Sequence, residues 1–107
     1  MQAYVDGLNR GDAEAVIALF AADAVIEDPV GTGPKQGQAI RAWFQQAVAM
    51  KAQLALATPI RGSHGDAAAM VFTVTTEWEG RRTTIRSLDV CTFDEAGRIT
   101  RLEGYWG

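Results

Sequence analysis

The stretch AAAMVFTVTTEWEGRRTTIRSLDVCTF (residues 67–93) decides the fold. On both sides of Glu79 and Gly80, β-branched and aromatic residues alternate with small or polar ones, as expected when successive side chains of a strand point to opposite faces. Two residues are enough to reverse the chain in a tight hairpin. The sequence therefore predicts two long antiparallel strands, over residues 67–78 and 81–93.

The period of two continues on both sides of this hairpin. The segments LALATPI (54–60) and RITRLEGYW (98–106) are further strand candidates, and short links between all four predict an antiparallel meander. The segment DAVIEDPVG (23–31) is a shorter extended run that Pro29 ends.

Before residue 54 the apolar residues recur instead at helical spacing. This spacing predicts a helix over residues 1–9 that Gly11 closes, and a second helix that Asp12 caps and that continues to Phe20. A third helix carries one apolar stripe: Ile40, Trp43, Phe44, Ala47 and Val48.

Helices followed by antiparallel strands predict an α+β fold, organised as a single domain over residues 1–107. We expect a curved antiparallel sheet with three N-terminal helices packed on its concave face, which would enclose a cone-shaped cavity.

An acid lies in an apolar row of this expected sheet. Alternation places Asp89 on the same face as Ile85, Cys91 and Phe93. Carboxylates are seldom buried without a partner, because removing their charge from water is costly. The same face carries a wall of apolar and aromatic side chains, which is either plain core or the lining of a cavity: Met70, Phe72, Val74, Trp78, Leu102 and Trp106.

Two further polar groups can converge on that wall. Tyr4 lies on the apolar stripe of the first helix, and its hydroxyl needs a partner if it is buried. Asp28 shares a face with Ala24 and Ile26, whereas Glu27 points the other way. Taken singly, each residue has a simpler structural interpretation, Tyr4 as a half-buried tyrosine with its hydroxyl in water and Asp28 as a turn residue before Pro29.

Composition excludes several other classes of function. The net charge of −3 argues against nucleic-acid binding, which normally requires a basic surface. One histidine and one cysteine cannot form a closed zinc site or an intrachain disulfide. With no apolar run long enough to span a bilayer and no signal sequence after Met1, we expect a cytoplasmic protein with no membrane or nucleic-acid partner and no cofactor or metal.

Three segments carry a resemblance to a known family: YVDGLNRGDAEAVIALFAADAVIEDPVG (4–31), RGSHGDAAAMVFTV (61–74) and SLDVCTFDEAGRITRLEGYW (87–106). They resemble the bacterial ketosteroid isomerases, of the SnoaL-like branch of the nuclear-transport-factor-two-like fold. The resemblance implies a deep apolar steroid pocket and a homodimer formed through the outer face of the sheet. It also implies that Asp28 is the general base and that Tyr4 and Asp89 form the oxyanion hole.

The chemistry of these residue types agrees with the resemblance. Moving a double bond into conjugation with a ketone needs one base that removes and returns a proton, and donors aimed at the ketone oxygen. Asp89 can donate if burial raises its pKa and keeps it neutral. We therefore expect a cofactor-free steroid delta-isomerase that takes an apolar ketosteroid, with ring contacts from four residues: Phe72, Trp78, Leu102 and Trp106.

Two alternatives stay open at this point. One is another enzyme of the same fold, such as a polyketide cyclase, a dehydratase or an epoxide hydrolase. The other is a non-catalytic carrier of an apolar ligand or a designed scaffold, which has no need of a base at Asp28.

The sequence also departs from the family pattern. Phe20 and Phe44 occupy positions where the family has supporting tyrosines, and only three residues precede Tyr4, fewer than in the family. The sequence thus resembles a shortened or engineered member.

Overall fold

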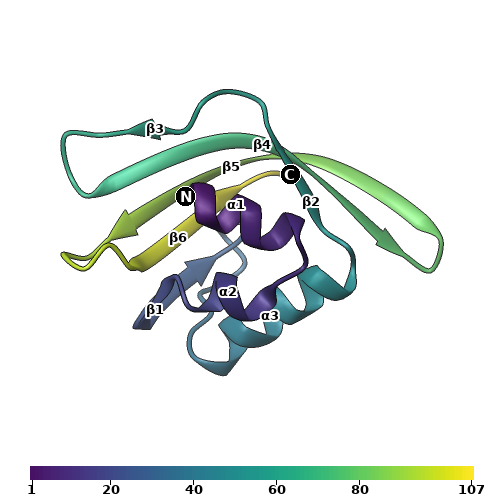
Figure 1. Cartoon of the computed structure of the whole chain (residues 1–107), viewed down its shortest axis with the longest axis horizontal. Helices are drawn as coiled ribbons and strands as arrows, with labels where there is room; N and C mark the ends of the chain where they lie inside the picture. Colours follow the sequence, from purple (N-terminus) through teal and green to yellow (C-terminus); the bar gives the residue numbers. More distant parts are fainter.

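The computed structural model describes all residues 1–107 and confirms the predicted α+β fold (Figure 1). Three helices and six strands follow one another along the chain: α1 (Gln2–Asn9), α2 (Ala13–Ile17), β1 (Phe20–Glu27), α3 (Gln38–Ala49), β2 (Gln53–Leu56), β3 (Arg61–Gly62), β4 (Ala67–Trp78), β5 (Arg81–Phe93) and β6 (Ile99–Tyr105).

The predicted hairpin of β4 and β5 forms the centre of the sheet. Its strands pair along their whole length, from Ala67 opposite Thr92 to Trp78 opposite Arg81. The sheet order is β1-β6-β5-β4-β2, with β3 paired to β4 off this path, and the sheet is not closed. The predicted meander is therefore correct for β2, β4, β5 and β6.

The sheet is mostly antiparallel, as expected, but one edge differs from the expectation, because β1 pairs with β6 in parallel. No hairpin joins these two strands, so no local turn forces them to run in opposite directions. The second predicted helix was also too long, because it ends at Ile17 and Phe20 already begins β1. The backbone amide of Ile99 donates to the carbonyl of Leu19 (2.8 Å), so pairing with β6 replaces the last turn of that helix.

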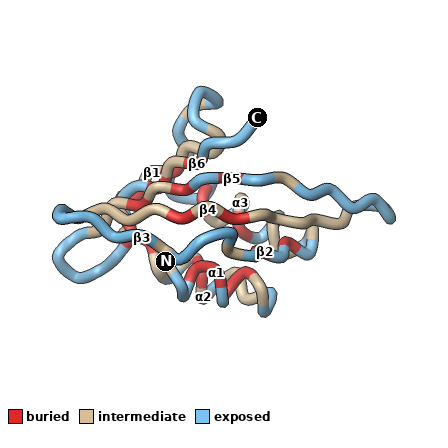
Figure 2. The backbone as a smooth tube through the Cα atoms, turned by 90° about the horizontal axis from the view of Figure 1, so that it is seen from above, coloured by how far each residue is buried: buried red, intermediate tan, exposed pale blue.

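The three helices lie on one side of the sheet (Figure 1), as predicted. Tyr4, Val5 and Leu8 of α1 and Ile40 and Phe44 of α3 are buried. Figure 2 shows that the buried positions lie mainly where strands and helices face each other, while the tip of the β4–β5 hairpin is exposed. None of the helices is long and apolar enough to cross a membrane.

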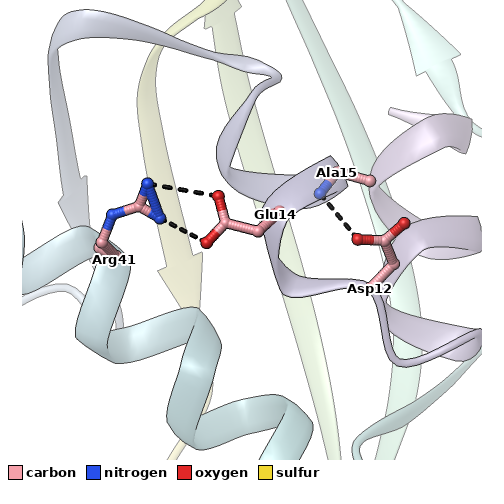
Figure 3. Close-up of polar contacts among 4 residues, drawn as sticks. All are labelled: Asp12, Glu14, Ala15 and Arg41. Atoms are coloured by element: carbon pink, nitrogen blue, oxygen red, sulfur yellow. Dashed lines mark hydrogen bonds and ion pairs between the residues drawn. The ribbon is translucent and has the colours of Figure 1, made fainter.

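Polar contacts fix the short helix α2 (Figure 3). The Asp12 carboxylate accepts a hydrogen bond from the amide of Ala15 (3.0 Å), which is the predicted N-cap. Arg41 of α3 donates to both carboxylate oxygens of Glu14, at 2.6 and 3.2 Å. These contacts join α2 to α3 and help to hold the helical layer over the sheet.

Candidate active site

A cavity of about 370 Å³ lies between the helices α1 and α3 and the sheet. Its volume is within the range of small-molecule sites, and most of the side chains that line it are hydrophobic. Tyr4, Asp28 and Asp89 all line this cavity. The fold therefore brings together three polar side chains from α1, the end of β1 and β5.

Asp89 is buried within the sheet, with 1% of its surface exposed. Its Oδ1 accepts a hydrogen bond from the hydroxyl of Ser87 (3.3 Å), whereas its Oδ2 has no partner. Burial, and then the charge of Asp28, raise the pKa of Asp89 to about 8, and the Ser87 hydrogen bond opposes this. At neutral pH the carboxyl group is therefore protonated and can donate a hydrogen bond into the cavity.

Tyr4 is held by aromatic packing. Its ring meets Phe44 edge to face with centroids 5.7 Å apart, and Phe44 packs on Phe20 at 5.3 Å. The phenol makes no hydrogen bond to another protein group. Burial, followed by the charges of Asp89 and Asp28, raises the pKa of Tyr4 well above its ordinary value. The hydroxyl thus stays protonated and is free to donate to a ligand.

Asp28 lies directly after β1 and is half-buried. The indole Nε1 of Trp106 donates a hydrogen bond to its Oδ1 (2.8 Å). Burial raises the pKa of Asp28, while the Trp106 hydrogen bond and the positive charge of Lys35 lower it. A carboxylate made more basic by burial, yet held by one donor, is suited to accept a proton.

Gly104 lies between the two acids. It pairs directly with Asp89 across β5 and β6, and the parallel register of β1 with β6 places Asp28 beside it, after the pair Glu27 and Glu103. A Cβ built at Gly104 would collide with the carboxyl group of Asp28. The absence of a side chain at Gly104 therefore leaves the space that the Asp28 carboxyl occupies.

The loop after Asp28 is fixed by the neighbouring carboxylate. Glu27 Oε2 accepts hydrogen bonds from the amides of Gly31 (2.9 Å) and Gly33 (3.3 Å). The end of this loop returns to β1, where Lys35 pairs with Ile26, and the Lys35 ammonium lies 4.5 Å from the centre of the Trp43 ring. Glu27 is thus occupied in the loop and does not line the cavity.

Residues 1–102 match the family model described as a SnoaL-like domain. The chain belongs to the SnoaL-like family. It is 35% identical over 103 residues to the steroid delta-isomerase of Nocardioides simplex, covering 96% of this chain and 83% of that protein.

Two other similar proteins are named as epoxide hydrolases or as similar to them. The chain is 31% identical over 109 residues to epoxide hydrolase LasB of Streptomyces lasalocidi, covering 97% of this chain and only 39% of LasB. A solved structure of the epoxide hydrolase/cyclase-like enzyme SalBIII, which has a role in pyran ring formation in the polyether salinomycin, superposes with a TM-score of 0.90. Its sequence identity is 28%, with 97% of this chain and 84% of that chain covered.

The expected ring contacts in this SnoaL-like chain fall into two groups. Phe72 and Trp106 line the cavity. Trp78 does not, because it lies at the exposed tip of the hairpin, with 51% of its surface accessible. Leu102 does not line it either, since it pairs with Cys91 and Ile26 in the fully buried core.

Sequence reasoning missed part of the lining. Trp43 lies on the predicted apolar stripe of α3, and Ser87 lies in the same row as Asp89. The sequence pattern could therefore have predicted that both residues line the cavity. The hydrogen bond from Trp106 to Asp28 had no local signal, because the two residues are 78 positions apart.

Cys91 is buried with its pKa raised to about 12 by burial and by Asp89, so its thiol is inert. The chain has no group of three or more His, Cys, Asp and Glu residues that could hold a metal ion.

Replacing Gly104 by alanine should lower turnover about 100-fold. A displacement of a reacting group such as the Asp28 carboxylate by about 1 Å lowers the rate by about that factor. The added methyl group must push the Asp28 carboxyl away from its present position over Gly104. Steady-state kinetics on the substrate proposed below measures the loss. Gly62→Ala is the matched control, because a Cβ there meets no atom within 4 Å. Unchanged turnover in Gly104→Ala would show that the position of Asp28 is not critical.

Proposed function

We propose that this SnoaL-like chain is a steroid delta-isomerase that moves the 5,6 double bond of a 3-ketosteroid into conjugation with the ketone. The observation that carries the proposal is the convergence of Asp28, Tyr4 and a neutral Asp89 on one apolar cavity. The relation to the Nocardioides simplex enzyme supports it.

The base in this mechanism is Asp28. Its carboxylate removes the proton from the carbon between the ketone and the double bond, which leaves a dienolate. The same carboxyl group, now neutral, returns that proton to the far end of the dienolate, and the enzyme regains its starting state. Trp106 holds one oxygen of Asp28 and leaves the other free for the proton.

Tyr4 and Asp89 stabilise the negative charge that develops on the ketone oxygen. Both are neutral donors without a competing protein acceptor, and the apolar walls strengthen each hydrogen bond by excluding water. An ionised Asp89 would repel the dienolate instead.

The direct experiment adds a 5-ene-3-ketosteroid and follows the ultraviolet absorbance of the conjugated product. We expect conversion far above the rate in buffer and transfer of the substrate's own proton, because one carboxyl group performs both steps. Absence of conversion with intact, folded protein would reject the isomerase.

Epoxide opening is a second candidate, favoured by the pairing of one protonated and one basic carboxyl group in the same cavity. Asp89 would donate a proton to the epoxide oxygen while Asp28 activates a water or a hydroxyl group of the substrate. The relations to LasB and SalBIII support this alternative. Incubation with an apolar hydroxy-epoxide separates the two: ring opening without steroid isomerisation would favour it.

Replacing Tyr4 by phenylalanine should lower kcat about 100-fold, near the lower limit for the loss of one oxyanion donor. We expect the lower limit because Phe20 and Phe44 provide no hydroxyl that would hold the phenol in place. Steady-state kinetics of the purified variant measures the change. Tyr105→Phe is the matched control, because it removes a phenol hydroxyl outside the cavity and keeps the exposed ring that the outer face of the sheet presents. Equal activity of Tyr4→Phe and the parent would remove Tyr4 from the oxyanion hole.

The same proposal includes a homodimer formed through the outer face of the sheet. Leu88 and Tyr105 pair there across β5 and β6, with 37% and 47% of their surfaces exposed. Large apolar side chains that remain exposed together on a sheet face are suited to cover each other in a dimer. Sedimentation equilibrium of the parent and of Leu88→Glu tests this assembly.

A further inference from the structure

The end of the cavity remote from Asp89 is polar. Thr76 of β4 and Thr83 of β5 line it and pair directly across the hairpin, and Gln46 of α3 lies in the same lining. Alternation along β5 puts Thr83 in the same row as Ser87 and Asp89. One face of the hairpin therefore connects the catalytic groups to this distal pair.

The distal polar groups have no protein partners. Neither the hydroxyls of Thr76 and Thr83 nor the Gln46 amide makes a side-chain hydrogen bond to another residue. The neighbouring pair, Thr75 and Thr84, faces away from the cavity, and its two hydroxyls bond to each other at 3.1 Å. Unpaired hydroxyl and amide groups can both donate and accept hydrogen bonds, so they suit a neutral polar group.

The spacing along the strand defines the length of a ligand that reaches both ends. Thr83 precedes Asp89 by six residues, which corresponds to about 20 Å along an extended strand. Two pairs lie between them, Val74 with Ile85 and Phe72 with Ser87, and all four residues line the cavity. Ser87 is the polar member, and its hydroxyl is already bonded to Asp89. Apart from Asp28 and Asp89, no acidic or basic side chain lines the cavity. The walls therefore match an elongated apolar molecule with a neutral polar group at its far end.

We propose that Thr76, Thr83 and Gln46 form a second polar subsite that binds a hydroxyl or carbonyl group at the far end of an elongated apolar substrate. The subsite rests on the proposed function, in which the reacting ketone lies between Tyr4 and Asp89. It narrows the substrate to ketosteroids with a side chain beyond the fused rings, oxygenated at its end.

The test measures equilibrium binding of two saturated 3-ketosteroids that cannot isomerise. Both carry the same side chain, which ends in a hydroxyl group in one ligand and in a methyl group in the other. Calorimetry on the parent should give a roughly 3- to 10-fold lower Kd for the hydroxyl ligand, as expected for one or two net hydrogen bonds.

Two matched double variants test whether the Thr76 and Thr83 hydroxyls cause the preference for the hydroxyl ligand. Thr76→Val with Thr83→Val keeps the shape and strand preference of the pair but removes both hydroxyls, so the preference should fall to near one. Thr75→Val with Thr84→Val makes the same change on the other face of the same strands, and the preference should remain.

Three results would overturn the subsite. The first is an equal Kd of the parent for the hydroxyl and methyl ligands. The second is a preference for the hydroxyl ligand that persists in Thr76→Val with Thr83→Val. The third is an equal loss of affinity for both ligands in that variant, which would mean that the two hydroxyls contact only water. Isomerisation of a 5-ene-3-ketosteroid without a side chain is measured separately. Failure there with the binding preference intact would reject the isomerase and keep the subsite, whereas absence of binding of either ligand would reject both.

Discussion

Asp28→Asn should lower kcat by on the order of 1,000- to 10,000-fold, because asparagine cannot accept the proton that the reaction must move. The amide has the same shape and still fits beside Gly104, and the cavity walls are unchanged. A planar phenolic steroid, which resembles the dienolate, should therefore bind with affinity equal to or tighter than in the parent. Single-turnover kinetics and fluorescence titration measure the two quantities.

An aspartate on the same strand provides the control for this substitution. Asp23→Asn makes the same chemical change at an exposed position of β1 and should leave turnover unchanged. Normal turnover in Asp28→Asn would assign the base elsewhere. Glu27 is a poor substitute, because its carboxylate is bound to the amides of Gly31 and Gly33 and does not line the cavity.

The sheet could be predicted well because its information is local. In residues 67–93 the alternation of side chains fixes which face each residue occupies, and the two-residue turn fixes the register. Asp89 was placed correctly in a buried row by this rule alone. The start of β1 could not be found in the same way, since the pairing of Phe20 with Ile99 depends on a strand that is distant in the sequence.

The sequence could predict those parts of the site in which one residue type at one position indicates a chemical role. Asp89 has a signal of its own, an acid in an apolar row. The surroundings of Asp28 have none, because Trp106 and Gly104 reach it through the parallel pairing of β1 and β6. The extent of the cavity was equally hidden. Trp78 shares the row of Phe72 but lies at the exposed end of the β4–β5 hairpin.

Asp89 should make the stability of the protein fall as the pH rises. Its folded pKa of about 8 exceeds the unfolded value of about 3.9, so between these values the native state holds a proton that the unfolded chain releases. The stability that comes from the neutral acid is fully present below about pH 4 and is lost as the pH rises toward 8. Within this window the slope approaches 1.4 kcal/mol per pH unit.

Chemical denaturation of the parent and of Asp89→Asn from pH 5 to pH 8 measures this slope as a difference, so that other titrating groups cancel. The asparagine side chain has no proton to lose. The free energy of unfolding of Asp89→Asn, relative to that of the parent, should therefore increase with pH. Parallel curves for the two proteins would show that Asp89 is an ordinary ionised carboxylate in the folded state.

Activity gives the second measurement on the same residue. In the parent, kcat should fall above about pH 8, where Asp89 ionises and repels the dienolate. Asp89→Asn should keep much of the activity and lose this upper limb, because its amide is a donor at every pH. Asp89→Leu removes the donor and should lower kcat about 1,000-fold, the upper limit for one oxyanion contact. Equal turnover in the asparagine and leucine variants would mean that no hydrogen bond from this position reaches the substrate, even if the stability curves diverge as expected.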